Sequence, residues 1–152
     1  MNNKYFSPDV SEFLFLLSKY KVKYLIVGGE AVIYYGHARL TGDIDVYYSI
    51  AKENVNKLYL ALKEFWNGSI PGSITENELF KDGMVFQFGV PPNRIDLLNK
   101  IEEGNFSEAW KNRKDVHLSY SGKKLKIHYI GLNEQKKNKA EVKRNKKKND
   151  LK

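Results

Sequence analysis

Apolar residues recur at helical spacing in two stretches of the chain. Over roughly 8–20, and again over 51–66, they line one side of a helix with 3.6 residues per turn and so predict amphipathic helices. Ser7-Pro8-Asp9 adds a capping hydroxyl, a proline suited to the first turn and an acid suited to the positive helix end. We predict two further helices, a short one from Glu30 to about Tyr35 and a basic one from Leu132 onward.

Short β-type runs lie between these segments, and they predict strands. They occupy Tyr24–Val27, 43–48, 84–88, 94–98, 116–120 and 125–129. Pro91-Pro92-Asn93 and Ser121-Gly122 separate the later runs into two hairpins, and residues 67–73 read as a loop. The order α-β-α-β-α, then hairpins and a helix, predicts an α/β (α+β) fold with a mixed sheet flanked by helices. We expect one domain over 1–135, with 136–152 as its basic C-terminal helix.

Charge and cysteine content narrow the function classes. The net charge is +8, and residues 136–152 hold nine basic residues against two acids, which leaves a nearly neutral body of 17 basic and 16 acidic residues. Such a tail favours a polyanion such as RNA, DNA or a nucleotide phosphate chain, with a solvated helix as an equally good explanation. The absence of cysteine excludes disulfides, thiolate metal sites and cysteine nucleophiles. With neither a signal peptide pattern nor a long apolar run, we expect a cytoplasmic protein.

Asp43-Ile44-Asp45 is the most informative triplet. In a strand, residues i and i+2 point to the same face, so both carboxylates would emerge together while Ile44 enters the core. Two like charges this close repel each other unless a cation lies between them, and carboxylate oxygens favour Mg²⁺ or Mn²⁺. An isolated Asp-x-Asp is also explained by a solvent-facing strand, or by an aspartate that caps the strand start.

Asp96 is a third carboxylate in a similar setting, within the apolar run 94–98. If its strand lies beside the first, the three aspartates form a cluster able to bind two divalent ions for phosphoryl transfer. Gly28-Gly29 follows a predicted strand and precedes a predicted helix, an arrangement that lets a phosphate approach the backbone and the helix N-terminus. No P-loop or dinucleotide-binding motif is present.

Together these residues resemble the signature of the polymerase-β-like nucleotidyltransferases. The motif Gly28-Gly29-Glu30, followed by Arg39-x-Thr41-x-Asp43-Ile44-Asp45, is similar to the abortive-infection (AbiEii-like) toxin-type branch. The resemblance implies a nucleotidyltransferase fold and binding of two Mg²⁺ ions, with Mn²⁺ as an alternative. Its catalytic and metal-binding residues would be Asp43, Asp45 and Asp96, and its nucleotide-binding residues Gly28, Gly29, Arg39, Thr41 and Lys139.

The activity implied is transfer of a nucleoside monophosphate from an NTP such as ATP to an acceptor hydroxyl, with release of pyrophosphate. The basic tail favours an RNA end as acceptor, which suits one component of a toxin–antitoxin or phage-defence pair. Two alternatives are a catalytic antitoxin that modifies a partner protein and a non-catalytic nucleic-acid-binding module on the same fold. We interpret His37, His117 and His128 as structural, because they lack metal-ligand spacing. Tyr47 and Tyr48 are candidates for stacking on a base.

Overall fold

The computed structural model describes residues 6–28, 43–90, 94–101, 104–131 and 134. The predicted helix over 30–35, the basic C-terminal helix and the predicted site residues Gly29, Arg39, Thr41 and Lys139 lie outside these residues. Within them, no helix is long and apolar enough to cross a membrane.

Six strands form one mixed sheet in the order β3-β4-β2-β1-β6-β5. They are β1 (Tyr24–Val27), β2 (Ile44–Tyr48), β3 (Val85–Phe88), β4 (Ile95–Leu98), β5 (Lys114–Tyr120) and β6 (Lys123–Tyr129). The β2–β4 and β1–β6 pairs are parallel, whereas the other three pairs are antiparallel. The predicted mixed sheet and α+β class are therefore confirmed.

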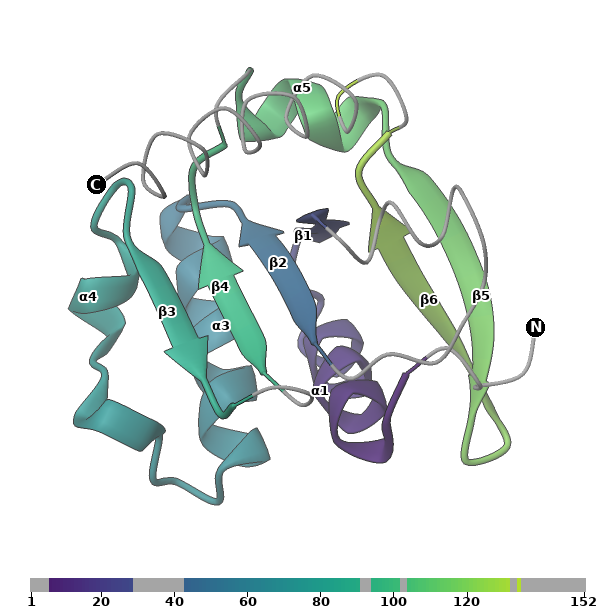
Figure 1. Cartoon of the computed structure of the whole chain (residues 1–152), viewed down its shortest axis with the longest axis horizontal. Helices are drawn as coiled ribbons and strands as arrows, with labels where there is room; N and C mark the ends of the chain where they lie inside the picture. Colours follow the sequence, from purple (N-terminus) through teal and green to yellow (C-terminus); the bar gives the residue numbers. More distant parts are fainter. Residues whose placement is uncertain (1–5, 29–42, 91–93, 102–103, 132–133, 135–152) are drawn as a thin grey trace, which may run out of the picture.

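Two long helices cover one face of the sheet, behind it in Figure 1. In α1 (Pro8–Lys19), the Ser7 hydroxyl accepts a hydrogen bond from the Val10 amide at 3.3 Å, which is the predicted cap. The second is α3 (Lys52–Phe65), and Phe13 meets Phe65 edge to face with ring centroids 5.4 Å apart. The core lies between these helices and the sheet residues that point towards them, such as Ile44 and Val46.

Three short helical segments were not predicted from the sequence. They are a 3₁₀ turn at Pro71–Ser73, within the predicted loop, and the helices α4 (Glu76–Leu79) and α5 (Phe106–Lys111). Both helices carry a capping pattern with a glutamate three residues after the cap: Thr75 accepts from the Glu78 amide, and Asn105 from the Glu108 amide. That pattern was the available sequence signal.

Helix α5 lies across the end of the sheet at which β2 and β4 finish (Figure 1). Its Phe106 meets Tyr47 of β2 with ring centroids 5.1 Å apart, and its Trp110 meets His128 of β6 at 4.9 Å. The predicted alternation of β2 into a polar and an apolar face therefore ends at Asp45, because Tyr47, although on the polar side, is buried.

Candidate active site

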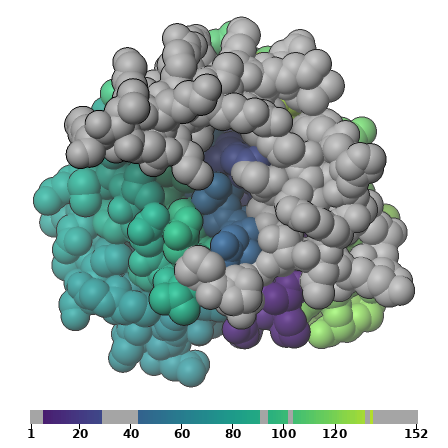
Figure 2. Space-filling view, viewed as in Figure 1, coloured from purple at the N-terminus to yellow at the C-terminus, as the bar shows by residue number. Residues whose placement is uncertain are grey.

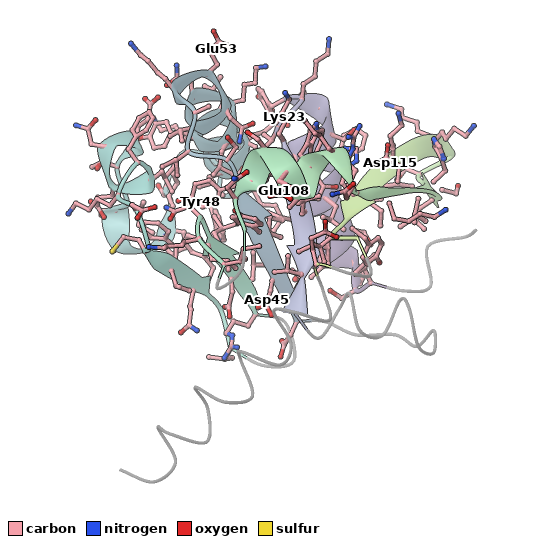
Figure 3. The ribbon with its side chains drawn as sticks, turned by 90° about the horizontal axis from the view of Figure 1, so that it is seen from above. Lys23, Asp45, Tyr48, Glu53, Glu108 and Asp115 are labelled. Carbon is pink, nitrogen blue, oxygen red and sulfur yellow. The ribbon has the colours of Figure 1, made fainter. Side chains whose placement is uncertain are left out.

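Strand register brings two of the predicted aspartates side by side. β2 and β4 run parallel, and Asp45 lies directly opposite Asp96. The two carboxylates belong to the sheet face opposite α1 and α3, since their neighbours Ile44, Val46 and Ile95 are buried in the core. Figure 3 shows Asp45 on the opposite side of the sheet from Glu53 of α3. In space-filling form, β2 remains visible beside β4 on this face (Figure 2).

The environment of Asp45 disfavours its charged form. The pKa of Asp45 is raised to about 6, mainly by burial and also by like-charge repulsion from the neighbouring Asp96, while Arg94 opposes the shift. Asp96 itself is only 6% exposed. A half-buried carboxylate pair of this kind is stabilised by any cation that lies between the two groups.

Arg94 and Gln87 are polar neighbours of Asp96 that the sequence reasoning missed. The Arg94 Nε lies 3.0 Å from Asp96 Oδ1, an ion pair whose angle does not make a hydrogen bond, and the Gln87 amide donates to Asp96 Oδ2 at 3.4 Å. Both residues had a sequence signal. Arg94 precedes Asp96 by two positions, hence on the same strand face, and Gln87 is the polar residue within an otherwise apolar strand.

Asp43 has a different role in this structure from that of Asp45. Its Oδ1 accepts a hydrogen bond from the Arg94 backbone amide at 2.8 Å, and the adjacent Ile44 amide donates to the Arg94 carbonyl at 2.9 Å. Asp43 thus ties the start of β2 to the start of β4, which is the capping alternative raised by the sequence. In the described part of the chain, no three carboxylate or imidazole side chains are grouped as a metal-binding set.

Gly28 lies against Asp45, because β1 is antiparallel to β2 and pairs Val27 with Asp45. Its φ is +68°, in the left-handed region, and a Cβ added there would overlap Asp45 Oδ2. A side chain at position 28 would therefore fill the space beside the carboxylate. Glycine therefore lets the Asp45 carboxylate approach the main chain this closely.

The tyrosines next to Asp45 cannot stack on a base in this structure, so that interpretation is wrong. Tyr47 lies under Phe106, and Tyr48 points to the helical side, where its hydroxyl donates to the Leu79 carbonyl at 2.9 Å. His128 is structural as predicted: its Nδ1 lies 2.6 Å from Asp115. His117 is exposed, and His37 lies outside the described residues.

Comparison with known proteins identifies the fold. No protein-family model matches the sequence, and no curated protein does. The structure is similar to the crystal structure of a provisionally assigned nucleotidyltransferase from Thermotoga maritima. The TM-score is 0.60 at 13% identity, covering 93% of this chain and 87% of the other. The chain therefore has the mixed-sheet α+β fold of a nucleotidyltransferase-type structure, and at this identity the likeness establishes the fold alone.

Proposed function

We propose that this protein is a metal-dependent nucleotidyltransferase that moves a nucleoside monophosphate from an NTP to an acceptor hydroxyl and releases pyrophosphate. The observation that carries the proposal is the register of β2 and β4, which sets Asp45 opposite Asp96 on the sheet face not covered by α1 and α3. The fold similarity to a provisionally assigned nucleotidyltransferase supports the same reaction class.

The donor set fits Mg²⁺, with Mn²⁺ as an alternative, because all three candidate ligands are carboxylates. Asp45 and Asp96 would hold the ion through neighbouring oxygens, and the elevated pKa of Asp45 reflects a repulsion that a divalent ion would relieve. Asp43 would contribute through the carboxylate oxygen that does not accept from Arg94. Bound as a pair, such ions polarise the phosphoryl group and favour ionisation of the attacking hydroxyl.

The chain's own residues would bind and position the two substrates. Gly28 lies directly beside Asp45 and would line the triphosphate, as the family resemblance implies. In the proposal Gly29, Arg39, Thr41 and Lys139 contact the nucleotide phosphates, as the family resemblance implies. Arg94, already paired with Asp96, orients that carboxylate towards the reacting groups.

The acceptor we favour is an RNA end, because the chain carries a net charge of +8. An RNA-modifying enzyme of this kind would suit a toxin–antitoxin or phage-defence system. Transfer to a partner protein, as a catalytic antitoxin would perform it, uses the same site with a different acceptor. A non-catalytic binding module would need neither Asp45 nor Asp96.

A labelling experiment separates these functions. The full chain is incubated with Mg²⁺, each α-labelled NTP in turn and a total cell lysate, and the labelled macromolecule is then identified. We expect label on RNA, and Asp45→Asn or Asp96→Asn should lower its rate at least about a hundredfold. Asp82→Asn, a matched change at an exposed carboxylate, should leave the rate unchanged.

Each outcome has a defined meaning once thermal melting has shown that the variants fold. Label on a protein supports the antitoxin alternative. Absence of label with every NTP refutes nucleotidyl transfer. Full activity in Asp45→Asn refutes the assignment of the metal site.

A further inference from the structure

The body of the chain is nearly neutral in total, but its charges are unevenly distributed along the sequence. Residues 1–110 contain 11 basic and 14 acidic residues, whereas 111–152 contain 15 basic and only 4 acidic ones. The change of sign falls at Lys111, just before the β5–β6 hairpin. Between Lys111 and Lys126 there are six basic residues and one acid, Asp115.

That one acid is already neutralised within the hairpin. Asp115 Oδ1 lies 3.0 Å from the Arg113 Nε and 2.6 Å from the His128 Nδ1. The lysines of the hairpin are therefore not offset by an unpaired carboxylate within the same element.

The hairpin has an apolar face and a polar face. Val116, Leu118, Leu125 and Ile127 are buried in the core. The alternate positions form the opposite side, which we call the outer face: Asp115, His117, Ser119, Lys124, Lys126 and His128. Lys124 and Lys126 pair across the ladder with Ser119 and His117, and all four are exposed. A shallow hollow of about 260 Å³ near the hairpin turn is lined by His117, Leu118, Ser119, Gly122, Lys123 and Lys124.

The outer face lies on the same side of the sheet as the two aspartates. Ile26 pairs with Tyr129 of β6 and with Val46 of β2, and all three residues are buried, so their neighbours His128 and Asp45 share the opposite face. Val27 of β1 is level with Asp45 of β2 and with a position that lies four residues after Lys126 on β6. Because β6 is also two strands away from β2, the separation between Lys126 and Asp45 is on the order of 15 Å.

The chemistry of the outer face distinguishes among polyanionic partners. The outer face contains no apolar side chain. A protein partner would need an apolar centre of the interface, and a membrane would need apolar groups that insert into it. Lysines that alternate with a histidine and a serine suit phosphates, and an exposed imidazole can stack on an unpaired base.

We propose that the outer face of the β5–β6 hairpin binds single-stranded RNA and guides its end towards Asp45 and Asp96. The path to the aspartates rests on the proposed function. The binding itself does not, so the two can fail separately: a chain that transfers no nucleotide can still bind RNA through the hairpin.

The test measures RNA affinity of the full chain at several salt concentrations, by fluorescence anisotropy with a labelled single-stranded oligoribonucleotide. Removing one lysine–phosphate interaction should make the slope of log K against log salt shallower by about 0.7. Lys124→Gln/Lys126→Gln should therefore make this slope shallower by about 1.4 and weaken the affinity at 0.1 M salt by roughly tenfold.

The matched control is Lys57→Gln/Lys63→Gln, which removes the same charge from exposed positions on α3, across the sheet. Because the C-terminal tail is present in every variant, its contribution cancels in the comparison. Equal slopes for the two double variants would overturn the proposal, as would tighter binding of a duplex of the same sequence than of the single strand. A weaker affinity in the hairpin variant alone supports it.

Discussion

Strand register places Asp45 beside Asp96, so the Asp96 carboxylate raises the free energy of ionising Asp45. Burial adds to this cost, and only Arg94 offsets it among the causes identified for Asp45. Buried charges in proteins are paired with an opposite charge, coordinate a metal ion or take up a proton. The electrostatic cost at these two residues is therefore the physical reason to expect a cation there.

The first prediction concerns the pH dependence of this cost in protein free of divalent ions. Because the pKa of Asp45 rises from 3.8 to about 6 on folding, the folded state holds the proton more tightly than the unfolded state. The free energy of unfolding should therefore fall as the pH rises through this window and stay lower above it. Asp45→Asn removes the ionisation and should stabilise the protein at pH 8 by on the order of 2 kcal/mol, but hardly at pH 4.

Urea denaturation in EDTA at both pH values measures this difference. Asp82→Asn, at an exposed carboxylate, should show no comparable gain at pH 8. Equal stability of Asp45→Asn and the unmodified chain at pH 8 would show that Asp45 carries no such penalty.

The second prediction concerns the ion itself. A ligand that binds only the folded state raises the melting temperature by mass action. Millimolar Mg²⁺ or Mn²⁺ at pH 8 should therefore stabilise the unmodified chain, and much less so the Asp45→Asn and Asp96→Asn variants. Thermal melting with and without the ion measures the shift, with Ca²⁺ for comparison. The same shift in all three proteins would place the ion elsewhere.

The third prediction concerns the contact between Gly28 and Asp45. Gly28→Ala places a Cβ in a left-handed conformation and against Asp45 Oδ2, whereas Gly68→Ala, at φ +90°, meets nothing within 4 Å. The control thus reports backbone strain alone, about 1 kcal/mol. Gly28→Ala should cost at least about 1 kcal/mol more in urea denaturation. Combined with Asp45→Ala the excess should disappear, and a persisting excess would mean that the clash lies with another group.

At the scale of elements, the sequence predicted the strands and the long helices but missed the short helices. The two long helices were marked by helical periodicity and the six strands by short β-type runs, and each appears within a few residues of its expected place. Helices α4 and α5, with four and six residues, are too short for a periodic signal, and only their caps marked them. The burial of Tyr47 depends on α5, so it could not be predicted without that helix.

The same limit applies to the candidate site. The i, i+2 spacing of Asp43 and Asp45 predicted a shared face, but sequence could not show which strands pair. The β2–β4 pairing that joins Asp45 to Asp96 is a contact across some fifty residues of chain. The hydrogen bond from the Arg94 amide to Asp43 also depends on that pairing.

The fourth prediction concerns the attachment of α3 to the sheet. Asn54 is buried; its Oδ1 accepts from the Lys23 amide at 2.7 Å, and its Nδ2 donates to the carbonyls of Lys23 and Ser49 at 3.0 and 2.9 Å. Asn54→Ala would leave these backbone groups unpaired and should cost about 2–4 kcal/mol in urea denaturation. Asn56→Ala, on the exposed side of the same helix, should cost less than about 0.5 kcal/mol. Similar losses for both would deny Asn54 this role.

At the scale of the whole molecule, the basic surface and the carboxylate site occupy different strands of one sheet. The carboxylates lie near the starts of β2 and β4, whereas the lysines of the outer face lie on β6, at the other side of β1. The first 110 residues have an excess of acids, and the remainder a large excess of bases. An anionic acceptor would therefore be attracted to one end of the sheet and react at another.

This separation leads to the last prediction, which concerns the kinetics of transfer to RNA. A group that only holds the acceptor changes KM, whereas a group at the reacting atoms changes kcat. Lys124→Gln/Lys126→Gln should raise KM for RNA roughly tenfold with kcat retained at saturating RNA, and the effect should shrink as salt increases. Asp45→Asn should lower kcat with little change in RNA affinity, and Lys57→Gln/Lys63→Gln should change neither. A hairpin variant with reduced kcat at saturating RNA would show instead that the hairpin shapes the active site, because an acceptor-binding surface acts only through occupancy.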